Sequence, residues 1–77
     1  MEVHFFPNPT SDLLYLEGDF EFGSYVKLFN SAGETITRQL INGKSFCIDL
    51  RRYVSGYYEV EIDNQNGQLQ RQKIFKI

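Results

Sequence analysis

Turn-forming residues recur along this chain at a spacing of about 8–12 residues, a pattern typical of a β-sandwich or a β-barrel. Each predicted turn is rich in Gly, Pro, Asn, Asp or Ser. The six turns are predicted at Pro7-Asn8-Pro9-Thr10, Glu17-Gly18-Asp19, Ser31-Ala32-Gly33, Asn42-Gly43, Ser55-Gly56 and Asn64-Gln65-Asn66-Gly67. Segments this short suit single strands, so we expect an all-β fold.

Apolar and polar residues alternate within the segments between these turns, which is the period of a strand with one buried face. The clearest case is Tyr58, Val60 and Ile62, which alternate with three acidic residues. We interpret this segment as an antiparallel strand whose acids, Glu59 and Glu61 among them, face water.

Seven strands follow from this pattern, and Asn66-Gly67 is predicted to form the hairpin turn between the last two. The strands are expected near residues 3–6, 13–17, 25–30, 35–41, 45–50, 57–63 and 68–76. Two antiparallel sheets packed face to face would give a small seven-stranded antiparallel β-sandwich of immunoglobulin-like type. The residues expected in its core are Leu14, Leu16, Val26, Leu28, Ile48, Tyr58, Val60 and Ile62.

Length and charge limit the number of domains and the class of partner. The 77 residues suffice for one domain with a modest core, so we expect a single domain over residues 1–77. The net charge of −2 argues against a nucleic-acid partner, because nucleic-acid binders usually carry a strong basic excess. Acids cluster near the start of the chain and bases near its end, an asymmetry that ordinary surface charge also explains.

No pattern of catalytic or metal-binding residues is present in the sequence. His4 is the only histidine and Cys47 the only cysteine, which is too few for a tetrahedral zinc site and excludes an internal disulfide. The glycines are scattered one per turn rather than gathered in a phosphate-binding loop. We therefore expect no cofactor, no metal and no enzymatic activity, and a module that binds or is bound.

Four motifs follow one another along the chain in a fixed order. The first two are Phe6-Pro7-Asn8-Pro9-Thr10-Ser11-Asp12 and Val26-Lys27-Leu28-Phe29-Asn30. The most recognisable is Ile48-Asp49-Leu50 followed by Gly56-Tyr57-Tyr58-Glu59-Val60, and the last is Lys73-Ile74-Phe75-Lys76. Their order resembles the type A C-terminal sorting domains of the type IX (Por) secretion system. Two departures, Arg51-Arg52 for the usual Ser-Asn and Tyr53-Val54 for Leu-Pro, affect the turn before Gly56.

The resemblance implies a function as an address rather than a catalyst. Such a domain forms the C-terminal part of a larger secreted precursor and follows an N-terminal cargo domain. The precursor crosses the periplasm, passes an outer-membrane translocon and reaches the cell surface or the extracellular space. A sortase-like cysteine protease commonly removes the domain there. Met1 would then be an expression start, and the export signal would lie on the longer parent chain.

Translocon recognition is expected at the motif residues, with a surface-binding module of different function as the alternative. The recognition residues implied by the resemblance are Pro7, Asn8, Pro9, Gly56, Tyr58, Lys73, Lys76 and Ile77. The edge of the last strand, residues 69–77, offers backbone groups to a partner. The alternative is a carbohydrate-binding or adhesion module, for which Phe20, Phe22, Tyr25 and Tyr57 are the candidate stacking aromatics; core packing explains the same residues.

Overall fold

The computed structural model describes residues 3–64 and 68–77, which form five antiparallel strands and no helix. The strands are β1 (Val3–Phe6), β2 (Leu13–Phe29), β3 (Thr35–Asp49), β4 (Gly56–Asn64) and β5 (Gln68–Lys76). β2 pairs with β1, β3 and β4, and β4 pairs in turn with β5. The all-β fold predicted from the turn spacing is therefore confirmed.

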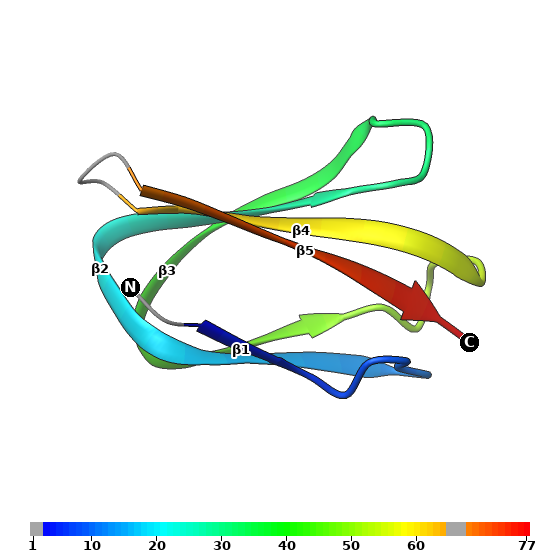
Figure 1. The fold of residues 1–77 in the computed structure, drawn as a ribbon, viewed down its shortest axis with the longest axis horizontal. Helices are drawn as coiled ribbons and strands as arrows, with labels where there is room; N and C mark the ends of the chain where they lie inside the picture. The colour runs from blue at the N-terminus through cyan, green and yellow to red at the C-terminus, as the bar shows by residue number, and fades with distance from the viewer. Residues whose placement is uncertain (1–2, 65–67) are drawn as a thin grey trace.

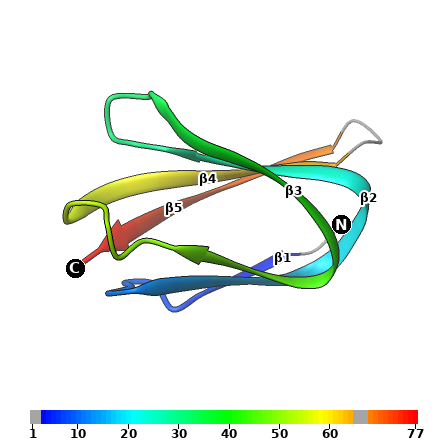
Figure 2. The same ribbon diagram turned by 180° about the vertical axis from the view of Figure 1, so that it is seen from behind.

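The two longest strands, β2 and β3, bend together and contribute to two packed layers (Figure 1). One layer contains β1, the first part of β2 and the last part of β3. The other layer contains the rest of β2 and β3 together with β4 and β5. Seen from behind, the bends close one end of a small antiparallel sandwich (Figure 2).

All seven predicted strand segments are extended, but they form five continuous strands because two predicted turns are absent. The turns expected at Glu17-Gly18-Asp19 and Asn42-Gly43 lie within strands. The β2–β3 register shifts on both sides of Phe20, where β-bulges let the paired strands bend without breaking. Gly23 and Gly43 have φ values of 87° and 90°, which side-chain-bearing residues rarely adopt, so glycine suits the bend.

The other turns agree with the sequence prediction. Gly33 donates its backbone N–H to the carbonyl of Asn30, and Tyr53 donates to Leu50, each at 3.0 Å. The Asn66-Gly67 turn lies outside the described residues, but β4 and β5 pair antiparallel on both sides of it, as a hairpin requires.

The core contains all eight residues predicted for it. Each of them is at most 5% exposed. Phe20, Ile41, Leu50 and Ile74 complete the buried cluster. Core packing was one of the two interpretations of Phe20, whereas Ile41 was not predicted. Both lie beside the bends, where simple alternation within a short strand fails to identify the buried face.

The acidic face of β4 is only partly in contact with water, which corrects the prediction for Glu61. Its side chain is only 7% exposed because β4 lies between β2 and β5, whose side chains flank it. Arg71 of β5 compensates the buried charge, with a guanidinium nitrogen 2.6 Å from a Glu61 carboxylate oxygen. Glu59, two residues before Glu61 on the same face of β4, is half-buried.

Replacing Tyr58 tests how much the core depends on one aromatic side chain. Tyr58 is 5% exposed, and its hydroxyl donates to the carbonyl of Val54 in the turn before β4. We expect Tyr58→Ala to reduce the free energy of unfolding by about 3–5 kcal/mol, and Tyr58→Phe by about 1–2 kcal/mol, since the latter removes only the hydrogen bond. Urea denaturation of both variants measures these values. Equal losses would show that the ring contributes little.

Candidate functional site

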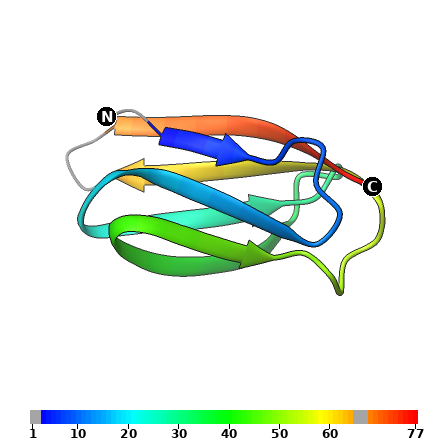
Figure 3. The ribbon, with the colours of Figure 1, turned by 90° about the horizontal axis from the view of Figure 1, so that it is seen from below.

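The predicted Pro-Asn-Pro-Thr turn and the last strand lie against each other. Thr10 forms a parallel bridge with Lys76: its N–H donates to the Phe75 carbonyl at 2.9 Å, and its carbonyl accepts from the Ile77 N–H at 2.8 Å. The Asn8 side chain donates to the carbonyl of Lys73 at 3.0 Å and accepts from the Phe75 N–H at 3.1 Å. Figure 3 shows the loop after β1 beside the C-terminal end of β5.

Gly56 belongs to the same end of the molecule because it begins β4 opposite Lys76. Its φ of 143° is rarely adopted by residues with a side chain, although nothing lies within 4 Å of the position a Cβ would occupy. The requirement for glycine is therefore conformational rather than steric. Gly56 starts the strand that aligns β5, and so positions the C-terminal end.

Tyr58 and Lys76 are buried, whereas the other predicted residues are more accessible. The ring of Tyr58 lies in the core, and its hydroxyl fixes the preceding turn in the manner of a tyrosine corner. Lys76 is 8% exposed, with its ammonium 3.5 Å from the carbonyl of Ile77. Both side chains support the recognition end from within, and neither presents a broad surface to a partner.

The accessible residues of the predicted set are Pro7, Asn8, Pro9, Lys73 and Ile77. In the last strand Ile74 and Lys76 face inward, while Lys73, Phe75 and Ile77 face outward. The structure therefore brings the two ends of the predicted set, which are more than 60 residues apart in sequence, onto one end of the sandwich.

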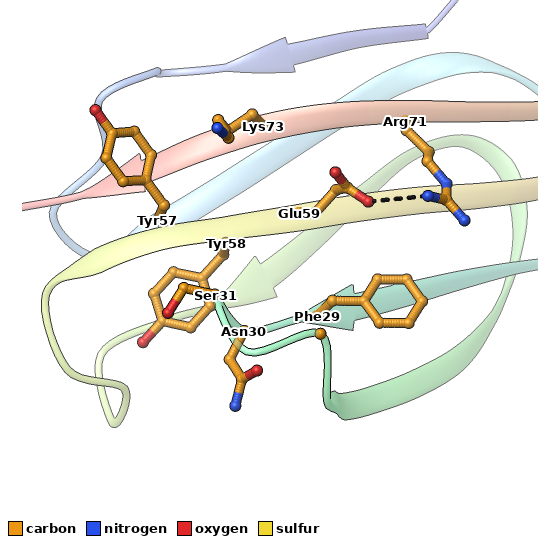
Figure 4. A pocket seen from close by; sticks show the side chains of 9 residues that line it. Phe29, Asn30, Ser31, Tyr57, Tyr58, Glu59, Arg71 and Lys73 are labelled. Atoms are coloured by element: carbon orange, nitrogen blue, oxygen red, sulfur yellow. Dashed lines mark hydrogen bonds and ion pairs between the residues drawn. The ribbon is translucent and has the colours of Figure 1, made fainter.

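A shallow hollow of about 460 Å³ adjoins this end on the outer face of β4 and β5 (Figure 4). Phe29, Tyr57, Arg71 and Lys73 line it together with the turn after β2. The Tyr57 ring lies 4.9 Å from that of Phe75, and the Lys73 ammonium lies 5.2 Å from the Tyr57 ring centre. Glu59 also lines the hollow, which therefore combines an exposed aromatic surface with two cationic groups and one carboxylate.

Phe75 and Arg71 lie in the predicted edge, residues 69–77, but their side chains were not among the predicted recognition residues. Arg71 pairs with Glu61 and reaches Glu59 at 3.3 Å, which leaves the Lys73 ammonium without a carboxylate partner among the described residues. The β4–β5 register brings these side chains together. Counting outward from a two-residue Asn66-Gly67 turn would pair Glu61 with Gln72, one residue away from the observed pairing of Glu61 with Arg71, so the sequence did not supply this register.

The candidate stacking aromatics lie in separate environments. Phe20 is in the core, and Tyr25 is half-buried beneath the Arg38 guanidinium, 4.0 Å from its ring centre. Tyr57 is exposed near the start of β4, whereas Tyr25 pairs with Asp63 near the end of that strand. The side chain of Phe22 lies outside the described residues. The described aromatics do not form one stacking surface.

The other candidate chemical groups lie apart from this end. Cys47 is a free, exposed cysteine on β3, and His4 is on β1 opposite Glu17. Among the residues that the structure describes, no group of three or more potential metal ligands is found. The same residues form no helix long and apolar enough to cross a membrane.

Comparison with protein families identifies this arrangement of motifs. The model of the secretion system C-terminal sorting domain matches residues 4–76. The chain belongs to this family. It is a C-terminal sorting signal of the type IX secretion system, and its family is not catalytic. Membership implies interaction with the type IX machinery and a secreted protein that reaches the cell surface or extracellular space. No curated protein matches the chain.

The turn in which this sorting domain departs from the family pattern is held by Asp49 and Arg51. Asp49 accepts the Arg51 backbone N–H and pairs with its guanidinium, at 3.0 and 2.8 Å. These hydrogen bonds lower the pKa of the Asp49 carboxyl from 3.8 to about 2. Arg51, which replaces the usual residue of the family pattern, therefore stabilises the turn through its bonds to Asp49.

The acid stability of the sorting domain should depend on Asp49. Because its pKa is lower in the folded state, its charge stabilises the fold above about pH 4, and this contribution is lost as the pH falls towards 2. Asp49→Asn should be less stable than wild type at pH 7, and this difference should become much smaller at pH 2. Urea denaturation at both pH values tests this, and Arg51→Ala should reproduce the pattern. A stability difference that persists unchanged at pH 2 would contradict it.

Proposed function

We propose that this domain directs an N-terminal cargo protein from the periplasm through the outer-membrane translocon of the type IX system. A sortase-like cysteine protease then separates it from the cargo at the cell surface. Family membership supports the sorting role, and a non-catalytic, folded module suits an address that is read after folding. In this proposal residues 1–77 are one domain of a larger secreted precursor.

The observation that carries the recognition step is the junction of the N-terminal turn with the last strand. Asn8 and Thr10 hold Lys73, Phe75 and Ile77 in place through hydrogen bonds. A partner that reads this end therefore contacts both motifs at once and only when the domain is folded. An unfolded precursor would display the same residues without their arrangement.

Lys73 is the member of this end best placed for a direct contact. Its side chain is exposed, stands over Tyr57 and is free of a carboxylate partner in the described part of the chain. A translocon carboxylate would gain an ion pair here without competing with an internal one. Lys76, whose side chain is buried, contributes instead by holding the end of β5 in position.

Delivery of a periplasmic reporter fused ahead of this domain tests the proposal. In cells that have the type IX machinery, the reporter should reach the cell surface. Lys73→Ala should reduce delivery about fivefold, the effect of losing a contact of about 1 kcal/mol. Its stability should change by less than about 0.5 kcal/mol, as expected for an exposed side chain.

Lys44→Ala is the matched control, because Lys44 is also exposed but lies in the β3 bend, beside Glu17 and Asp19. It should be delivered as wild type. Retention of the folded wild-type fusion in the periplasm, while a native sorting domain is exported in parallel, would reject the function. Normal delivery of the folded Lys73→Ala variant would reject Lys73 as a contact.

A further inference from the structure

The outer edge of β5 is divided into a covered half and an open half. The Lys73 carbonyl, both backbone groups of Phe75 and the Ile77 N–H point away from β4 and bond to Asn8 or Thr10. The Gln72 side chain also donates to the Lys73 carbonyl, at 3.3 Å. Residues 8–10 thus form a strap over this half. Successive residues of a strand point their backbone groups to opposite sides, so those of Leu69 and Arg71 point the same way as those of Phe75. No strand of the described chain pairs with that half.

The strap is a poor substitute for a regular strand. Pro7 and Pro9 have no backbone N–H to donate, and the side-chain amide of Asn8 takes the place of a backbone group. Asn8 is exposed, whereas Thr10 is buried and donates its hydroxyl to the Leu13 carbonyl at 2.7 Å. Thr10 is therefore the anchor of the strap, and Asn8 is the part that can leave without opening the core.

An extended segment of regular backbone would fit the edge better than Asn8 does. It would pair first with Leu69 and Arg71 and then take over the Lys73 carbonyl and the Phe75 N–H. Thr10 already occupies the end of this edge in parallel orientation, which shows that the edge accepts an extended chain in that direction. An acidic side chain on the segment would complement Lys73, which forms no ion pair within the described chain.

We propose that the edge of β5 from Leu69 to Phe75 binds an acidic, extended segment of the export machinery, and that Asn8 is a latch which this segment displaces. The identity of the partner rests on the proposed function. The latch itself is a property of the isolated domain, so the two parts are tested separately. In this proposal the N-terminal turn and the last strand act together, because Asn8 of the turn controls a partner's access to the edge of β5.

Hydrogen exchange of the isolated domain tests the latch. The Phe75 N–H points to Asn8, whereas that of Ile74 points to β4, so the two neighbouring amides report on the edge and on the sheet. Asn8→Ala should speed exchange at Phe75 about fivefold or more, since about 1 kcal/mol of hydrogen bonding is lost, and leave Ile74 within about twofold of wild type. Equal changes at both amides, or none at Phe75, would overturn the latch.

Cross-linking during export tests the partner. A photo-cross-linking amino acid replaces Leu69 in the precursor, and Leu40 is the matched control position: the two are 57% and 61% exposed, and Leu40 lies on β3, at the opposite edge of the same layer. Position 69 should cross-link to a component of the machinery and position 40 should not. Asn8→Ala should raise the yield at position 69. Equal cross-linking at both positions, or none at position 69 in a precursor that is delivered, would overturn the docking edge.

A backbone substitution separates strand addition from side-chain contact. Leu69→Pro removes an outward N–H, and Leu69→Ala removes the side chain but keeps that N–H. Strand addition predicts that folded Leu69→Pro precursor loses delivery several-fold more than Leu69→Ala; equal delivery would reject strand addition.

Sedimentation of the isolated Asn8→Ala domain shows whether the edge of β5 binds the export machinery or a second copy of the domain. A monomer supports a segment of the machinery, and a dimer that Leu69→Pro dissociates would show that the edge receives a second copy instead.

Discussion

The bend shared by β2 and β3 is the constraint on which the rest of this sorting domain depends. A chain of 77 residues can fill only one small core, and a single sheet would leave one apolar face in water. Because both long strands cross from one layer to the other as a pair, the backbone hydrogen bonds continue through the bend. The same hairpin therefore supplies strands to both faces of the core and fixes their separation.

This arrangement leaves the two layers joined by strands at one end and held by short contacts at the other. At the end opposite the bends, Thr10 bridges the first layer to β5, and the Asn8 side chain bonds to the backbone of Lys73 and Phe75. These contacts are few, and all involve the residues of the sorting motifs. The same residues therefore close the sandwich and form the proposed recognition end. A substitution among them can reduce both stability and recognition, so the two effects must be measured separately.

Local alternation predicted the core well because eight positions lie in straight parts of strands, where a period of two identifies the buried face. It failed where the structure depends on contacts between residues that are far apart in the sequence. Gly18 and Gly43 look like turn residues, but whether a glycine ends a strand or bends it depends on the strand paired beside it. Likewise, Glu61 is buried by residues of β2 and β5, and no pattern within β4 indicates which neighbours those are.

The candidate site was likewise predictable only in part. The motifs name most of its residues, yet neither motif indicates that Asn8 bonds to the backbone of Lys73 and Phe75, because backbone groups leave no trace in a residue pattern. The prolines beside Asn8 acquire a meaning only when the strap is seen on the edge of β5: they prevent it from pairing as a full strand. A perfect strand there would protect the edge permanently, and a missing one would leave it open to aggregation. A strap that is anchored by Thr10 but covers Lys73 and Phe75 with one side-chain amide protects the edge while keeping that part available to a partner with a better strand.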